Sequence, residues 1–446
     1  MATVTVGGGS ALDVSAIGLT NFAASAGGSL TGSYSSAPNA STKDIIYGSL
    51  NYDAGGQLTD GIVTAFERYV SGSLVFRIAD ISVPITSSSV WFGAALPISS
   101  LLNSDDVING GNGADILNGF NGTDVINGGA GDDTISADYG YDVLIGGPGN
   151  DRLIGAGVAG ITLTARYSGQ ASDYSTTKNG DGTWTVRDLR AGSPDGTDTL
   201  TNISVVSYAD RAILLDPSPS MAALFTAGQN ILRADVKALA ANFDFLETGW
   251  QVGNGADIGI AVSGLVDAAK GTTSVATLAY QFFTGKVPSA GGLDFLVSAT
   301  GPNANNINSA YYQAFSLENR YINFAVNLGK VGEGATAFNA TYGPLTLFDA
   351  TRAAYTTIFG GAPTDAKVHA LIDTRVDYFA AYGGDGATGI GTKAAMVGWL
   401  LAEAVKADVG MYAKSNDALL TDLADGATLA VNLVGVYGHP EYVYSG

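Results

Sequence analysis

The chain has 446 residues, and several residue types are absent from it or scarce. Cysteine is absent, which excludes disulfide bonds and thiolate metal sites. The only histidines, His369 and His439, form no His-Glu-x-x-His zinc motif, so a metzincin protease is excluded. Lysine and arginine number 21 against 41 acidic residues, for a net charge of −20. Nucleic acid is therefore not an expected partner, whereas cations are.

Long apolar runs are also missing. No stretch of about 18 apolar residues occurs, so no transmembrane span is expected. Residues 1–6 lack the basic patch and apolar core of an ordinary signal peptide, which predicts export by another route. Gly-x-x-x-x-Gly-Lys-Ser/Thr loops and Gly-x-Ser-x-Gly elbows are absent too, and the chain is not expected to be an enzyme.

Three regions precede residue 217. Residues 1–103 alternate short apolar runs with glycine and serine, a pattern typical of β-strands and turns. Residues 104–157 are a repeat rich in glycine and aspartate, and residues 158–216 return to strand-like patterns. We therefore expect a β-rich N-terminal region, a repeat, and a β-strand extension of that repeat.

The pattern turns helical after Asp216-Pro-Ser-Pro219, which is typical of a domain boundary. A single helix face is predicted from the i, i+4, i+7 and i+11 spacing of Leu232, Val236, Leu239 and Phe243. Similar runs follow, and glycines at 285, 343, 360 and 383 are expected to end helices. Residues 221–440 are predicted to be mainly α-helical, so the fold class is multidomain α+β.

The repeat has a period of nine residues. Each aspartate is followed two positions later by an aliphatic residue, from Ile108 to Leu153. Glycines allow positive φ angles and turn carbonyl groups toward a common point, and each aspartate adds a charged oxygen. Calcium prefers roughly six to eight oxygen ligands. The predicted calcium-binding positions are Asp106, Gly111, Gly113, Asp115, Gly122, Asp124, Gly129, Gly131, Asp133, Gly140, Asp142, Gly147, Gly149 and Asp151.

This pattern resembles the RTX nonapeptide, Gly-Gly-x-Gly-x-Asp-x-aliphatic-x, which builds a parallel β-roll. The resemblance implies two nonapeptides per turn, so that loops 18 residues apart stack on one edge. The intact copies start at 110, 128 and 146 and predict a well-formed edge through Asp115, Asp133 and Asp151. The copies at 119 and 137 have lost glycines, so the edge through Asp106, Asp124 and Asp142 is expected to bind more weakly.

Charge repulsion supports metal loading. Residues 104–157 contain nine aspartates and one arginine, a net charge of −8. Calcium binding would then supply folding free energy. Further along, Asp195-Gly-Thr-Asp-Thr-Leu200 resembles a segment that often follows RTX rolls, and Asp195 and Asp198 are candidates for another calcium site. A solvated turn is an equal alternative there.

A second resemblance lies in the helical region. The segments that carry it are 279–285, 288–297, 310–315, 318–328 and 334–338. They resemble the membrane-proximal helical domain of alphaproteobacterial RTX-type S-layer proteins, which grips the O-polysaccharide of lipopolysaccharide. In that family the anchor precedes the repeats, whereas here it follows them, and this chain is much shorter.

Segment 309–328 is predicted to present two stripes. A core stripe holds apolar side chains, and a polar stripe beside it offers amides and an arginine near aromatic rings, which suit sugar hydroxyls. A solvated face is the alternative for each polar residue. The predicted polysaccharide-binding residues are Ser316, Arg320, Asn323 and Asn327.

Three hypotheses for the function follow. The first is a calcium-dependent surface protein tethered to O-polysaccharide on the outer cell surface, after type I secretion with a C-terminal signal expected near 431–446. The second is a self-assembling S-layer or filament subunit, with open strand edges in residues 1–103. The third is a hydrolase with an unrecognised site.

Overall fold

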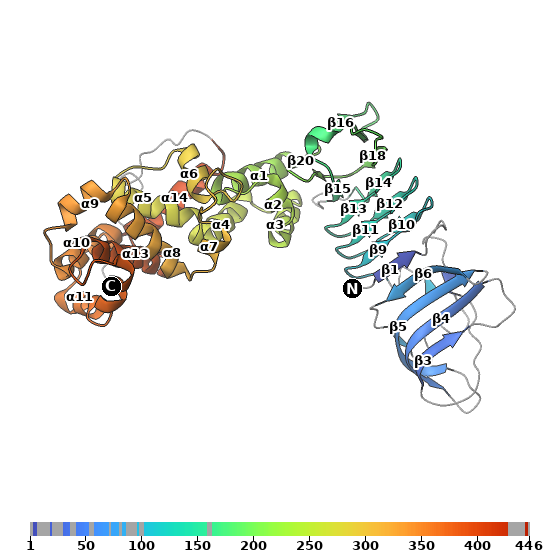
Figure 1. Ribbon diagram of the computed structural model, residues 1–446, viewed down its shortest axis with the longest axis horizontal. Coiled ribbons are helices and arrows are strands. Elements are labelled where there is room, and N and C mark those ends of the chain that lie inside the picture. The colour runs from blue at the N-terminus through green and yellow to red at the C-terminus, as the bar shows by residue number, and fades with distance from the viewer. Residues whose placement is uncertain are drawn as a thin grey trace. The chain divides into compact units, whose positions relative to one another are not determined.

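The structure is a computed structural model. It describes residues 3–6, 18–19, 30–35, 42–52, 58–70, 73–79, 83–85, 96–97, 102–157, 163–426 and 442–444. The expected secretion signal at 431–446 lies almost entirely outside these residues. Two compact units are formed (Figure 1): a β unit, Met1–Ser218 with Val236–Gly255, and a helical unit, Pro219–Asp235 with Ala256–Gly446.

The repeat folds as a parallel β-roll, as predicted, and its strands form two stacks (Figure 1). Sheet I contains β9 (Val107–Asn109), β11 (Val125–Asn127) and β13 (Val143–Ile145). Sheet II contains β10 (Ile116–Asn118), β12 (Thr134–Ala137) and β14 (Arg152–Gly155). Paired residues are 18 apart, as in Ile126 opposite Ile108. All six aliphatic residues predicted to point inward are 0% exposed: Ile108, Leu117, Ile126, Ile135, Leu144 and Leu153.

Sheet I extends beyond the roll into the N-terminal region. β1 (Thr3–Val6) pairs in parallel with β9 and antiparallel with β6 (Ser73–Ala79), so it joins the two regions. The described strands agree with the β-rich character expected for residues 1–103. The others are β3 (Leu30–Ser35), β4 (Thr42–Tyr52), β5 (Leu58–Val70) and β7 (Val83–Ile85) in sheet I, and a separate pair, β2 (Gly18–Leu19) with β8 (Leu96–Pro97).

The last turn of the roll carries an insertion. Sheet I ends with β15 (Thr164–Arg166), β19 (Val205–Ser207) and β20 (Ala212–Leu214). Sheet II continues through β18 (Thr197–Thr201) to the antiparallel strands β17 (Trp184–Asp188) and β16 (Tyr174–Lys178), which follow the short helix η4 (Ala171–Asp173). Two helices, α2 (Val236–Ala240) and α3 (Phe243–Gly253), complete the β unit.

The single helix predicted across Leu232 to Phe243 is wrong. The structure ends α1 (Pro219–Leu232) before Arg233, which takes φ 54°, and starts α2 at Val236. The two sides of the break bind different units. The Arg233 guanidinium donates to Asp294 of the helical unit, whereas Lys237 Nζ donates to the carbonyls of Tyr208 and Ala209 in the β unit.

The helical unit is built around α13 (Ile390–Ala407), which packs on α8 (Leu317–Val326), α10 (Leu347–Phe359) and α12 (Val376–Gly383). Among its described residues, no helix has the length and apolarity to cross a membrane. Its other helices are α4 (Ile258–Ala268), η5 (Ala269–Gly271), α5 (Thr273–Thr284), α6 (Ala290–Val297), α7 (Ala310–Gln313), the π-helix η6 (Asn327–Val331), α9 (Ala335–Tyr342), α11 (Asp365–Ile372) and α14 (Met411–Leu423).

Helix ends mostly fall where the sequence predicted. Gly285 and Gly360 follow α5 and α10 with φ angles of 68° and 85°, and α9 ends just before Gly343. Gly383 instead remains in α12, and Gly384 takes the left-handed conformation with φ 66°. The sequence therefore located this helix end to within one residue.

Candidate metal centre

The repeat aspartates form a ladder along each edge of the roll, directly before the strands. Edge I holds Asp106, Asp124 and Asp142, which precede the strands of sheet I. Edge II holds Asp115, Asp133 and Asp151, which precede the strands of sheet II. All six residues are buried, with at most 2% of their surface exposed. The predicted stacking of loops 18 residues apart is thus present at both edges.

Each ladder is held by hydrogen bonds between successive turns. On edge II, the amides of Asp115 and Asp133 donate to Oδ1 of the aspartate 18 residues later, at 2.7 and 2.8 Å. On edge I, the amides of Asp106 and Asp124 do the same, both at 2.8 Å. One carboxylate oxygen of each acceptor is therefore fixed by the backbone, which orients the other.

That second oxygen is left without a donor. Oδ2 of Asp124, Asp133, Asp142 and Asp151 is buried and accepts no hydrogen bond. A buried carboxylate oxygen is costly unless a donor or a metal ion compensates it. Four such atoms on two regular ladders are the observation that a bound cation would explain.

Backbone carbonyls supply further oxygens between the turns. A Cβ on Gly147 would come within 1.9 Å of the Gly129 oxygen, and one on Gly149 within 1.9 Å of the Gly131 oxygen. These glycines also have φ angles of 106° and 155°, which other residues rarely adopt. No three acidic or histidine side chains of the described residues gather as a metal site. An ion would therefore need these carbonyls together with the carboxylates, a donor set that suits calcium.

Electrostatics also favours a cation at the ladders. Burial raises the pKa of Asp124 to about 8, with the charges of Asp142 and Asp106 adding to the effect. Burial likewise raises the pKa of Asp151 to about 7 and those of Asp133 and Asp142 to about 6. Without a cation, these carboxylates are held in an environment that penalises their charged form. A divalent ion removes that penalty.

Edge I has lost part of the glycine framework of edge II. Phe120 stands where edge II has Gly111, Gly129 and Gly147, and it adopts φ 61° while its ring packs on the roll core. Gly140 is retained, and a Cβ there would come within 1.5 Å of the Gly122 oxygen. Edge I therefore keeps its aspartates and only part of the close carbonyl approaches.

The two aspartates of the Asp195–Asp198 segment have different partners. Asp198 extends the edge II ladder, because its Oδ1 accepts the amide of Asp151 at 2.9 Å. Its Oδ2 accepts the hydroxyl of Tyr167 at 2.8 Å, a partner that the sequence did not reveal. Asp195 instead pairs with Arg190 at 2.7 Å. Asp198 thus ends the ladder with a protein donor, and Asp195 lies in an ion-pair cluster.

The four predicted polysaccharide-binding residues fall into two groups, which differ in their contacts with the rest of the helical unit. Ser316 caps α8 by accepting the amide of Asn319, and Arg320 donates to the carbonyls of Phe315, Gly271 and Gln313. These contacts fix the start of α8. The side chain of Asn323 is half-buried and that of Asn327 is exposed.

The aromatic surface beside these asparagines is partly open. The Asn327 amide lies 3.5 Å from the hydroxyl of Tyr312, whose ring packs edge-on against Tyr311. Tyr311 is 60% exposed. Among the described residues, Asn323 therefore has no side-chain hydrogen bond, and Asn327 has only this long contact with Tyr312.

Comparison with known families identifies both regions. A model of the RTX calcium-binding nonapeptide repeat matches residues 102–135 and 127–159, and a model of the RsaA N-terminal domain matches residues 272–445. The chain joins RTX calcium-binding repeats to a domain of the RsaA N-terminal type. Both expected resemblances are confirmed. No curated protein matches the chain.

These matches indicate a calcium-binding cell-surface protein of the S-layer type, and both families are of structural, non-enzymatic kinds. The RsaA-type match begins at residue 272, within the helical unit. It leaves α1 and α4 outside, although both pack with α14 inside the same unit. The helical unit is therefore larger than the matched region.

Proposed function

We propose that the roll folds on calcium at the outer cell surface and that the helical unit tethers the protein to the O-polysaccharide of lipopolysaccharide. The observation that carries this proposal is the RsaA N-terminal match over residues 272–445, next to RTX repeats in the same chain. The reversed order of the two regions does not conflict with it, because each lies in its own compact unit.

The chemistry of α8 supports the tether. Asn323 and Asn327 lie one helical turn apart, and the Asn327 amide contacts Tyr312, whose ring packs against Tyr311, so an amide and aromatic surface adjoin. Each net hydrogen bond to a sugar contributes only about 1 kcal/mol. Useful affinity therefore requires a long polysaccharide that occupies several sites.

Co-sedimentation of the calcium-loaded full chain with purified lipopolysaccharide tests the tether. We expect pelleting with smooth lipopolysaccharide and none with rough lipopolysaccharide that lacks O-polysaccharide. Asn323→Ala with Asn327→Ala should weaken pelleting severalfold, whereas Asn339→Ala on the exposed side of α9 should not. Equal binding to both lipopolysaccharides would contradict the proposal.

Assembly into a lattice or filament is the second candidate function. The RsaA-type domain belongs to an S-layer family, and β10 forms the end of sheet II with Ile116 43% exposed. An end strand offers backbone groups for pairing with another copy. Electron microscopy of the full chain with calcium separates the two functions, since ordered arrays support assembly and dispersed particles support a tethered monomer.

A further inference from the structure

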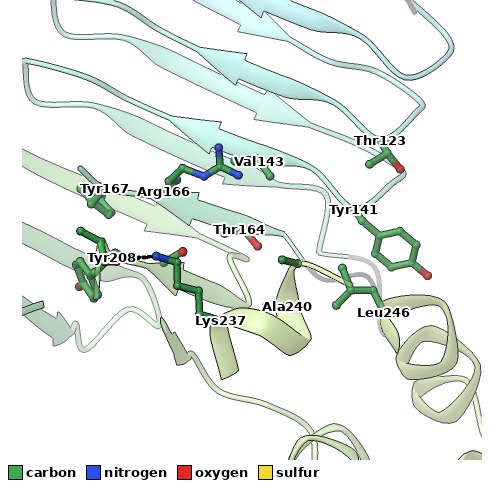
Figure 2. A pocket seen from close by; sticks show the side chains of 13 residues that line it. Thr123, Tyr141, Val143, Thr164, Arg166, Tyr167, Tyr208, Lys237, Ala240 and Leu246 are labelled. Atoms are coloured by element: carbon green, nitrogen blue, oxygen red, sulfur yellow. Dashed lines mark hydrogen bonds between the residues drawn. The ribbon is translucent and has the colours of Figure 1, made fainter. Parts of the chain in front are cut away.

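A pocket lies wholly within the β unit, and none of the ladder aspartates lines it. Its volume is about 490 Å³, within the range of small-molecule sites. The outer face of sheet I forms one wall through Val143, Thr164 and Arg166 (Figure 2). Lys237 and Ala240 from α2 and Leu246 from α3 form the facing wall (Figure 2).

Four polar side chains that line this pocket make no polar contact with the rest of the described protein. Within the part of the chain that the structure describes, the side chains of Arg166, Thr164, Thr123 and Ser207 have no hydrogen-bond or ion-pair partner. Arg166 is exposed on β15, in a protein whose net charge is −20. A guanidinium that has no acidic partner among the described residues, in a chain this acidic, is available to a ligand.

The charged groups around Arg166 indicate how much negative charge a ligand in this pocket should carry. Lys237 adds a second cation to the pocket, although its Nζ already donates to the carbonyls of Tyr208 and Ala209 at 2.9 and 2.8 Å. The Tyr141 hydroxyl donates to Glu247, which brings one acid near the wall. With one free guanidinium and one acid nearby, the pocket suits a ligand with a single negative charge better than a ligand with two negative charges.

We propose that this pocket binds an acidic sugar unit, with its carboxylate on Arg166. The guanidinium matches a carboxylate in a two-point hydrogen bond. The free hydroxyls of Thr164, Thr123 and Ser207 suit a polyol, because a hydroxyl both donates and accepts. The apolar wall of Val143 and Leu246 suits the C–H face of a pyranose ring.

The pocket adjoins the backbone of edge I. Thr123 and Tyr141 come directly before Asp124 and Asp142, and the amide of Thr164 donates to the Asp142 carbonyl at 2.9 Å. The wall that carries the hydroxyls is therefore part of the same turns that hold the ladder. Sugar binding should be measured with calcium present, at a fixed free concentration.

Calorimetric titration of the full chain with methyl glucuronide and with methyl glucoside tests the assignment. The two ligands share a ring and differ in the carboxylate. The glucuronide should bind at least about tenfold more tightly than the glucoside, because only the glucuronide can form the charge-assisted hydrogen bond with Arg166. Equal affinities would overturn the role of the carboxylate, and equal binding of acetate or inorganic phosphate would overturn the role of the sugar ring.

Two variants localise the site. Arg166→Gln should lower glucuronide affinity about tenfold, whereas Arg187→Gln, at an exposed arginine on β17, should leave it unchanged. Thr164→Val keeps the shape of a β-branched residue and should lower affinity severalfold, which keeps the test open if Arg166→Gln fails to fold. Wild-type affinity in both pocket variants would place the ligand elsewhere and overturn the proposal.

Discussion

Buried aspartates of the roll and buried Lys393 of the helical core differ in how their charges are satisfied. In the roll, buried Asp133 and Asp151 each keep an oxygen without a donor. In the helical core, buried Lys393 donates to the carbonyls of Tyr342 and Gly343 at 3.0 and 2.9 Å. The roll thus needs an ion to complete its interior, whereas this buried charge of the helical core is satisfied by the chain itself.

Removal of calcium should separate the two regions most strongly. We expect chelation to unfold the roll and to leave the helical core folded, because six buried aliphatic side chains cannot offset the repulsion of the ladder carboxylates. Hydrogen exchange read by mass spectrometry would report both regions at once. Amides of β10 to β14 should lose protection while those of α13 keep it.

Magnesium at the same concentration is the control, because it is smaller and demands stricter geometry than calcium. It should not restore protection in the roll. A roll that stays protected after chelation would show that its carboxylates need no ion, and the comparison would fail.

The pH should act on the metal-free roll in the direction set by its raised pKa values. Asp124 has a folded pKa of about 8 and Asp151 of about 7, both above the ordinary 3.8. Their neutral forms favour folding, so stability is fully present below about pH 4 and is lost as pH rises through 7 to 8.

Circular dichroism of chelator-treated protein should therefore show β-structure returning as pH falls from 8 to 5. Calcium-loaded protein should respond in the opposite sense, because protons displace the ion. A metal-free roll that is less ordered at pH 5 than at pH 8 would contradict this direction.

The helical core should lose stability by a smaller amount, and independently of calcium, when its buried charge is removed. Lys393→Met leaves the carbonyls of Tyr342 and Gly343 without a donor, at a cost of about 1–3 kcal/mol. Urea unfolding followed by the helical signal would measure this loss. Lys367→Met on the half-buried face of α11 is the control and should change little. If the loss of stability in Lys393→Met depended on calcium, the helical core would not be independent of the roll, contrary to this prediction.

Local periodicity explains which features the sequence could predict. The nine-residue spacing placed Ile126 in the core and Asp133 on a ladder, because both follow from positions within one repeat. Contacts across the insertion were not predictable in this way. Asp198 rejoins the edge II ladder 47 residues after Asp151, and Tyr167 caps it from the segment after β15.

The same limit applies to the helical unit. The polar stripe of α8 was visible in the sequence, but the role of Arg320 was not. Its guanidinium donates to the carbonyl of Gly271, which lies 49 residues earlier. Likewise, the helix predicted through Leu232 is divided because Arg233 and Lys237 bind partners distant in sequence, Asp294 and the Tyr208–Ala209 carbonyls.

The smallest expected effect lies between the two edges of the roll. Asp124 and Asp133 are matched, because each accepts the amide of the preceding turn and donates its own amide to the next. Asparagine keeps one accepting oxygen for the ladder hydrogen bond and replaces the other oxygen with an uncharged NH2 group, so the ladder geometry should persist in both variants. Asp133→Asn should nevertheless lower calcium affinity more than Asp124→Asn. Edge II keeps close carbonyl approaches at Gly129, Gly147 and Gly149, whereas edge I has Phe120 in place of one glycine. The calcium affinities of the two variants should differ severalfold to about tenfold, or by about 1 kcal/mol, which is the typical contribution of one polar contact. Calorimetric titration of both variants measures it, and equal losses would mean that the damaged loops bind as well as the intact ones.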